Sequence, residues 1–290
     1  MSETGQTVEA LLSDAALRIG GDSARLDAEV LLEHVVNKGR TWFRTWPEHR
    51  IADEQYERFE QLISARLQGR PVAHLVGERG FWSLDLKVNE HTLIPRPDTE
   101  CLVETALSLP VPDGARVLDL GTGTGAIALA LASERQDWTV RATDAIAEAV
   151  ELARKNVEML GLAVDVQQSD WFRDLAPGGY DLIVSNPPYI VAGDHHLEEG
   201  DVRFEPHSAL VAGADGLDDL REIIAQAPEW LNEDGWLVVE HGYDQAESVR
   251  ALFMQQGFVA VASHRDYGDN DRLTSGQWSA KKREAQTSAD

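Results

Sequence analysis

The chain has 290 residues, of which 43% are hydrophobic, and its 26 basic and 50 acidic side chains give a net charge of -24. This composition fits a globular protein of one or two domains. A field of that sign repels phosphate backbones, which disfavours direct nucleic-acid binding and favours basic partners.

No segment approaches the roughly 20 apolar residues that a membrane helix needs, so no membrane association is expected. The start Met1-Ser2-Glu3-Thr4 lacks the features of a signal peptide, and the lone Cys101 cannot form an internal disulfide. These features favour a cytoplasmic enzyme. No self-complementary apolar stripe is visible, so a monomer is expected.

Residues 1–72 are predicted to form a small helical domain. Apolar side chains recur at helical spacing over residues 8–19, from Asp22 or Ser23 to about Val35, and from about Asp53 to Leu67. Trp42 and Trp46 lie between the second and third patterns and are expected to be core anchors.

Residues 73–95 are predicted to be a β-hairpin linker. Polar and apolar side chains alternate over Ser83 to Val88, which is typical of a strand. We expect it to pair with residues around Leu93 and Ile94.

From residue 96 to residue 280, strand and helix patterns alternate. Candidate strands cover residues 116–120, 140–144, 164–167, 182–185 and 236–240, with helices over 126–132 and 148–160. Residues 257–264 and 272–280 have no helix between them and should form an antiparallel hairpin. The fold class predicted is therefore α/β, a doubly wound, mostly parallel sheet of seven strands that ends in this hairpin. The polar tail 281–290 is expected to be disordered.

A glycine loop, Gly121-Thr122-Gly123-Thr124-Gly125, follows the first strand of this domain and precedes a helix. Glycines allow tight turning and close approach of a ligand to the backbone. The spacing differs from the dinucleotide pattern, so a nucleoside without phosphates suits the loop better than a pyrophosphate. The segment resembles the first motif of class I S-adenosylmethionine-dependent methyltransferases, which implies that cofactor.

Two acidic positions extend the predicted cofactor site. Asp144 ends the second strand, where a carboxylate can accept both ribose hydroxyls, although it could instead cap the following helix. Asp170-Trp171-Phe172 follows the third strand and suits an adenine, with Asp170 near the exocyclic amine and either aromatic against the ring. Either aromatic could also belong to the core.

Asn186-Pro187-Pro188-Tyr189 directly follows the fourth strand, at the sheet edge where open α/β folds bind ligands. The Asn186 side-chain oxygen and the Pro187 carbonyl could accept both hydrogens of a planar NH2 group and aim its nitrogen at a methyl donor. Pro188 and Tyr189 would pack on its faces. A proline turn that merely ends the strand is the alternative. His195 and His196 follow without further ligands at metal-binding spacing, so no metal site is predicted.

The Asn-Pro-Pro-Tyr motif resembles that of amino-methyltransferases, which act on adenine N6 in DNA or on glutamine N5 in proteins. Other segments resemble the release factor glutamine methyltransferase family, known as PrmC or HemK. They are Gly77 to Trp82, Leu93 to Glu100, Phe204 to Leu210 and Val239 to Gly242. Glu240-His241-Gly242 ends a strand at the same edge and could shape the floor of the cleft, and the Arg96 to Glu100 segment could start a helix or form a lid.

This resemblance implies N5 methylation of the glutamine in the Gly-Gly-Gln loop of class 1 peptide chain release factors. It places cofactor residues at Gly121 to Gly125, Asp144, Trp171 and Asn186, and substrate residues at Asn186 to Tyr189. The helical domain would then dock the substrate. A DNA adenine methyltransferase and a non-catalytic cofactor-binding assembly factor are the alternatives.

Overall fold

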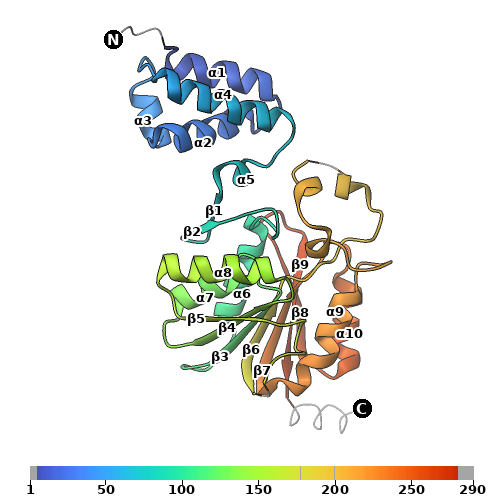
Figure 1. Ribbon diagram of the computed structural model, residues 1–290. Coiled ribbons are helices and arrows are strands. Elements are labelled where there is room, and N and C mark those ends of the chain that lie inside the picture. Colours follow the sequence, from blue (N-terminus) through green and yellow to red (C-terminus); the bar gives the residue numbers. More distant parts are fainter. Residues whose placement is uncertain (1–4, 177, 199, 280–290) are drawn as a thin grey trace. The chain divides into compact units, whose positions relative to one another are not determined.

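The structure is a computed structural model that describes residues 5–176, 178–198 and 200–279. Two compact units make up the fold (Figure 1). The first takes in the chain up to Glu78 together with Glu198–Phe204, and the second takes in Arg79–Leu197 and the chain from Glu205 onward. The tail predicted over 281–290 lies outside the described residues.

The first unit is a helical bundle. Its helices are α1 (Val8–Ile19), α2 (Ala24–Val36), α3 (Arg40–Thr45), α4 (Asp53–Leu67) and α5 (Val72–Val76). Thr7 caps α1 by accepting a hydrogen bond from the Ala10 amide at 3.3 Å. Leu12, Phe59 and Ile63 are fully buried between the helices. The three long helices are confirmed, whereas α3 and α5 are too short for their periodicity to be recognised in the sequence.

The expectation for Trp46 was wrong, while Trp42 packs against the core. Trp46 follows the last residue of α3 with a non-helical backbone (φ -126°, ψ 57°), and it remains 58% exposed. The Trp42 ring lies nearly perpendicular to the rings of Phe43 and His49, with centroids 6.0 and 4.8 Å away. One tryptophan therefore anchors this segment.

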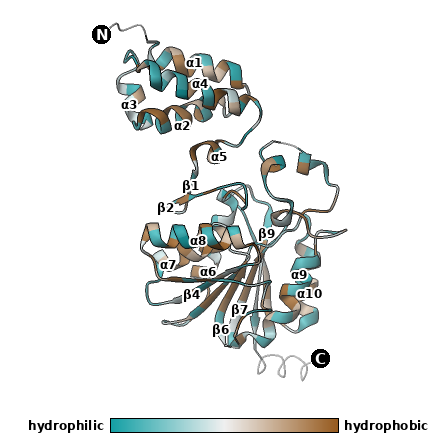
Figure 2. Ribbon diagram, in the orientation of Figure 1, coloured by the Kyte–Doolittle hydropathy of each residue, from teal (hydrophilic) through white to brown (hydrophobic). Residues whose placement is uncertain are grey.

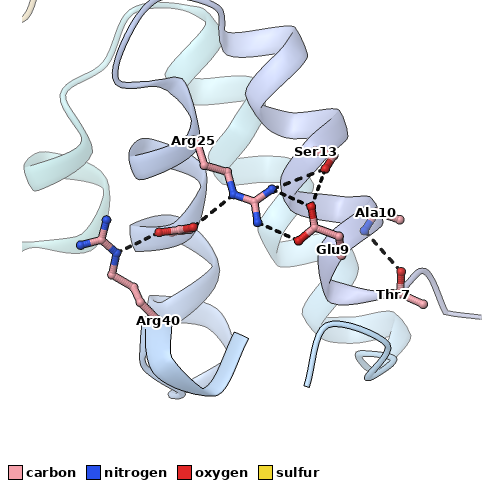
Figure 3. A network of polar contacts seen from close by, with 7 residues as sticks. Thr7, Glu9, Ala10, Ser13, Arg25 and Arg40 are labelled. Atoms are coloured by element: carbon pink, nitrogen blue, oxygen red, sulfur yellow. Dashed lines mark hydrogen bonds and ion pairs between the residues drawn. The ribbon is translucent and has the colours of Figure 1, made fainter. Parts of the chain in front are cut away.

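An ionic network joins three helices of the bundle (Figure 3). Arg25 of α2 pairs with Glu9 of α1 at 2.8 Å, and Glu29 accepts from Arg25 at 3.1 Å and from Arg40 of α3 at 2.8 Å. Each pair contains an arginine whose side chain is 42–47% exposed, and ion pairs with such access to water contribute at most about 1 kcal/mol each.

Arg66 of α4 connects the bundle to the distant segment Glu198–Phe204. Its guanidinium pairs with Asp27 of α2 at 2.8 Å and with Asp201 at 3.0 Å. The sequence pattern did not predict that this segment belongs to the helical unit.

The second unit begins with a hairpin of β1 (Glu78–Phe81) and β2 (Leu84–Lys87). The predicted strand is therefore confirmed, but its expected pairing with Leu93 and Ile94 was wrong. Trp82 takes a left-handed backbone (φ 58°) in a two-residue turn, so the chain folds back on the preceding residues instead.

The central sheet has seven strands in the order β5-β4-β3-β6-β7-β9-β8. Their bounds are β3 (Arg116–Leu120), β4 (Thr139–Asp144), β5 (Val164–Gln168), β6 (Tyr180–Ser185), β7 (Leu231–Glu240), β8 (Val259–Arg265) and β9 (Asp271–Trp278). Strands β3 to β7 pair in parallel, and β9 pairs antiparallel to β7 and β8. This confirms the predicted doubly wound sheet and its closing hairpin.

Helices cover both faces of the sheet (Figure 1). One face packs against α6 (Glu100–Ser108), α7 (Ala126–Glu134) and α8 (Ala147–Leu160), and the other against α9 (Asp218–Gln226) and α10 (Ala246–Gln256). Figure 2 shows hydrophobic residues along the strands between these layers. None of the helices in the described part of the chain has the length and apolar character needed to span a bilayer.

Candidate active site

Four parallel strands end in register at one edge of the sheet. Leu120 pairs with Thr143 on one side and Ser185 on the other, and Ser185 pairs with Val239. The next residue on each strand therefore stands in one row, and the row is Asp144, Gly121, Asn186 and Glu240. The strand order reverses between β3 and β6, which is where open α/β sheets bind ligands.

A cavity of about 260 Å³ opens beside this row. From the predicted site it is lined by Gly121 to Thr124, Asp144, Asp170, Trp171, Asn186 and Pro188. Gly125, Phe172, Pro187 and Tyr189 are not among the lining residues. Most of the predicted cofactor residues thus meet around one cavity, although they come from four separate loops.

The glycine loop is shaped for close approach of a ligand. Gly121, Gly123 and Gly125 all have left-handed backbones, with φ of 68°, 56° and 86°. Asp144 holds this loop, because its Oδ2 accepts from the Gly123 amide at 2.9 Å while its Oδ1 accepts from the Ile146 amide at 2.9 Å. The N-cap residue of α8 is Ile146, so Asp144 does not take the capping position.

The Asp144 carboxylate can still bind a ligand after making these two bonds. Each carboxylate oxygen has further acceptor capacity, and Asp144 lines the cavity. Burial raises the pKa of Asp144, and this effect outweighs the hydrogen bonds from backbone amides, which lower the pKa. Two neighbouring hydroxyl donors, such as those of a ribose, would complete the hydrogen bonding of this buried group.

Trp171 forms a wall of the cavity against the glycine loop. A Cβ atom at Gly121 would come within 3.2 Å of the Trp171 ring. Trp171 itself has a left-handed backbone (φ 48°), and its carbonyl accepts from the Ser169 hydroxyl at 2.8 Å. Such an unfavourable conformation persists only where its surroundings hold it. The flat ring is suited to pack against a base.

Gly121→Ala should therefore weaken cofactor binding by about tenfold, since the new methyl group would displace the Trp171 ring from the wall of the cavity. Calorimetric titration with S-adenosylmethionine measures the effect. Gly114→Ala is a control, because Gly114 also has a positive φ (69°) but a Cβ atom there meets nothing within 4 Å. An equal affinity in wild type and Gly121→Ala would contradict this role for Trp171.

Phe172 is a correction to the predicted cofactor site. Its side chain is only 1% exposed and stacks on Trp230, with the ring centroids 5.3 Å apart. The chain turns at this point, so Trp171 faces the cavity while Phe172 faces the core beneath α9.

The two acidic side chains beside Trp171 lie on different elements. Asp170 pairs with Arg173 at 2.5 Å, and Asp219, at the start of α9, also lines the cavity. Burial raises the pKa of Asp219, while a hydrogen bond from Trp171 lowers it. Asp219 was missed because helix α9 gave no sequence signal that its first turn would reach the site.

The Asn-Pro-Pro-Tyr segment presents Asn186 and Pro188 to the cavity. Asn186 Nδ2 donates to Thr99 Oγ1 at 3.2 Å, which leaves the Asn186 side-chain oxygen available as an acceptor. Tyr189 was expected to pack on a face of the substrate, but it does not line the cavity. Its hydroxyl donates to Glu240 Oε1 at 3.0 Å, and its carbonyl accepts from Gln245 at 3.0 Å.

Burial raises the pKa of Tyr189, and the neighbouring carboxylate of Glu240 raises it further. Tyr189 is therefore a neutral side chain that donates its hydroxyl proton to Glu240. Glu240, expected to shape the floor of the cleft, lies behind the cavity lining and holds Tyr189.

A second pair joins two other segments at the cavity. Arg96 lines the cavity, and its Nη2 contacts both oxygens of Glu205 at 2.8 and 2.9 Å. Ser208 and Ala209, just after Glu205, line the same cavity. Thr99 is the last residue of the short helix Pro97–Thr99 and the N-cap residue of α6, so this segment starts a helix and also reaches the site.

Asp119 lies directly below the glycine loop and is fully buried. Its Oδ2 accepts from the Thr122 hydroxyl at 2.5 Å and from the Ala128 amide at 3.2 Å. Burial raises the pKa of Asp119 from 3.8 to about 7. The folded protein thus holds this proton more tightly than the unfolded chain does.

This difference predicts a pH-dependent stability. The contribution of Asp119 to the free energy of unfolding is fully present below pH 3.8 and is lost as pH rises to about 7. The free energy of unfolding, measured with denaturant at several pH values in this range, should fall less with rising pH in Asp119→Asn than in wild type. Glu240, whose pKa burial also raises to about 7, leaves part of the slope in the variant. Identical slopes in the two proteins would contradict the assignment.

Asp194, His195 and His196 bring one possible metal-ligand atom each to within 4.8 Å of one another. Asp194 already accepts from the His196 amide and ring, at 2.9 and 2.7 Å. These contacts explain the cluster as a local turn on an exposed loop.

The fold and the site together define an S-adenosylmethionine-dependent methyltransferase. Residues 97–201 match the family described as Methyltransferase small domain, and residues 7–77 match the PrmC N-terminal domain. The fold is similar to that of a methyltransferase from Pyrococcus furiosus, with a TM-score of 0.54 and 18% identity over 74% of this chain and 97% of the other.

Curated relatives identify the family more closely. A release factor glutamine methyltransferase of Pseudomonas aeruginosa is 57% identical over 94% of this chain and 99% of the relative. One of Shewanella oneidensis is 54% identical over 90% of this chain and 92% of the relative. The chain belongs to the release factor glutamine methyltransferase family, which confirms the family expected from its motifs.

Proposed function

We propose that this enzyme transfers a methyl group from S-adenosylmethionine to the N5 nitrogen of the glutamine in the Gly-Gly-Gln loop of class 1 peptide chain release factors. The observation that carries the proposal is the Asn186 amide, whose NH2 group is held by Thr99 so that its oxygen remains available beside the glycine loop. Membership of the family supports the choice of glutamine as the amide.

The cofactor would be held by the residues around the cavity. The Asp144 oxygens suit the ribose hydroxyls, the Trp171 ring and Asp170 suit the adenine, and the open backbone of Gly121 to Thr124 suits the remaining chain. When bound, S-adenosylmethionine supplies an electrophilic methyl group on a positively charged sulfur. The acidic and aromatic lining suits that charge.

The protein's part in the reaction would be to position the amide nitrogen. The Asn186 oxygen and the Pro187 carbonyl would each accept one hydrogen of the glutamine NH2 group. This holds the nitrogen in line with the methyl group, so orientation is the main source of rate. The amide lone pair is delocalised, and two acceptors favour the more pyramidal nitrogen of the transition state. The nitrogen's proton becomes acidic as the new bond forms, so no strong base is needed.

The helical unit would dock the release factor, and the whole protein would act in the cytoplasm as a monomer. The net charge of -24 suits a basic protein surface. The same charge disfavours the alternative of a DNA adenine methyltransferase, because DNA binding requires cationic contacts to phosphates. We therefore expect no direct nucleic-acid contact.

Labelled S-adenosylmethionine distinguishes these functions. The protein would be incubated with a release factor in one reaction and with adenine-containing duplex DNA in another, and label would be counted in each macromolecule. We expect label on the release factor alone. Label on DNA alone would refute the proposal, and no label on either would favour a non-catalytic assembly factor.

A further inference from the structure

One side of the cavity is formed by the segment between β2 and the short helix Pro97–Thr99. The residues of this segment that line the cavity are His91, Thr92, Leu93, Pro95 and Arg96. The groups proposed to hold the ribose and the adenine of S-adenosylmethionine come from other loops, around Asp144 and Trp171. The part of the cofactor that still needs partners is its amino-acid end, which carries an ammonium group and a carboxylate.

Thr92 in this segment has a buried hydroxyl group without a partner. Thr92 is 2% exposed, and its Oγ1 has no hydrogen-bond partner among the described residues. The side chain lies against the glycine loop, because a Cβ atom at Gly123 would come within 3.9 Å of the Thr92 Cβ. Buried hydroxyl groups are rarely left without a hydrogen bond, so we expect a ligand in the cavity to supply it.

Arg96 brings a permanent positive charge to a cavity with an acidic lining. Among the described residues that line the cavity, Arg96 is the one arginine or lysine, whereas Asp144, Asp170 and Asp219 all line it. A carboxylate placed beside three aspartates is repelled unless a cation offsets their charge. Arg96 is therefore the group that can admit a carboxylate to this cavity.

The Arg96 guanidinium is held in place and keeps donors for a ligand. Its Nη2 contacts both oxygens of Glu205 at 2.8 and 2.9 Å, and the Glu205 side chain is fully buried. A guanidinium has five N–H bonds, and the three on Nε and Nη1 donate to no described residue. Arg66 shows that one guanidinium in this chain can pair with two carboxylates, those of Asp27 and Asp201, at 2.8 and 3.0 Å.

We propose that residues 91–96 bind the amino-acid end of S-adenosylmethionine, with Arg96 paired to its carboxylate and the Thr92 hydroxyl hydrogen-bonded to the same end. Glu205 is then a positioning residue, because it holds the guanidinium while Nε and Nη1 stay available. A planar guanidinium with a permanent charge is well suited to a carboxylate. Recognition of the carboxylate would also distinguish the whole cofactor from nucleosides that share its adenine and ribose.

Arg96→Gln tests the carboxylate contact through two ligands, S-adenosylmethionine and decarboxylated S-adenosylmethionine, which lacks only that group. In calorimetric titrations we expect the variant to raise the dissociation constant of S-adenosylmethionine by about 10- to 100-fold, because a charge-assisted contact is lost. The dissociation constant of the decarboxylated ligand should stay within about threefold of wild type. Equal weakening of the two ligands, or no weakening of either, would overturn the role of Arg96.

Two further variants control for charge and for loss of structure. Arg265→Gln removes the same charge from a side chain that is 61% exposed and does not line the cavity, so both dissociation constants should be unchanged. Arg96→Gln alone leaves the buried Glu205 carboxylate without its arginine, which is destabilising. In the double variant with Glu205→Gln, two amides replace the ion pair, and we expect the same selective loss. A wild-type ratio of the two dissociation constants in the double variant would contradict the proposal.

Thr92 is tested with methylthioadenosine, which keeps the adenine, ribose and sulfur but lacks the amino-acid end. Thr92→Val has nearly the same shape and no hydroxyl, so it should raise the dissociation constant of S-adenosylmethionine by about 3- to 10-fold and leave that of methylthioadenosine unchanged. Thr92→Ser should bind both ligands as wild type does. Unchanged binding of S-adenosylmethionine to Thr92→Val, or equal weakening of both ligands, would refute the role of Thr92. These titrations need no release factor, so they decide the cofactor contacts even if the proposed glutamine substrate is wrong.

Discussion

Asn186→Ala is expected to lower kcat for methyl transfer by about 10²- to 10³-fold, the loss seen when one preorganised hydrogen-bonding group is removed from a reaction centre. The variant loses the acceptor proposed to orient the substrate amide, and the Thr99 hydroxyl loses its partner. Single-turnover kinetics on a release factor measure the effect directly, because they separate chemistry from product release.

Cofactor affinity is the control for this variant. Asn186 is one residue among many that line the cavity, so its loss should change the dissociation constant of S-adenosylmethionine much less than it changes kcat. A variant with near-normal turnover would contradict the assigned role. A variant that binds no cofactor would show that Asn186 acts in binding instead.

Asp144→Ala is expected to lower mainly the affinity for the cofactor, whereas Asn186→Ala lowers mainly kcat. The substitution leaves the Gly123 and Ile146 amides without their partner and removes the proposed ribose contact. Hydrogen bonds to a charged group are worth roughly 1.5–3 kcal/mol each, so the dissociation constant should rise by about 100-fold. Calorimetric titration measures this change.

Asp144→Asn is the matched variant, because the amide retains one acceptor oxygen and loses the charge. We expect its affinity to lie between those of wild type and Asp144→Ala. If both variants bind as tightly as wild type, Asp144 serves only to hold the glycine loop.

The parts of the fold predicted correctly are those set by local patterns. The strand that ends at Leu120 and the helix after Gly125 follow directly from apolar spacing and the glycine loop between them. The partner predicted for the strand Leu84–Lys87 was wrong. The observed pairing depends on a turn in which Trp82 takes a left-handed backbone conformation, and such a conformation is uncommon for a bulky residue. The prediction that Trp46 is buried in the core was wrong because its exposure depends on where a short helix ends.

The candidate site divides in the same way. The glycine loop, Asp144 and Asn186 end strands, so the parallel sheet brings them together without further information. Thr99 stands 87 residues from its partner Asn186, and Arg96 stands 109 residues from Glu205, so no local pattern indicates these contacts. Phe172 was assigned to the cofactor because adjacent aromatics look alike in sequence, whereas in the structure Trp171 lines the cavity and Phe172 is buried against Trp230.

The most direct test of the account is to locate the transferred methyl group. A release factor treated with this enzyme and S-adenosylmethionine would be digested and its peptides sequenced by tandem mass spectrometry. We predict a single methyl group on the side-chain nitrogen of the glutamine in the Gly-Gly-Gln loop, absent when Asn186→Ala replaces the wild-type enzyme. A methyl group on any other residue, or equal methylation by the variant, would contradict the account.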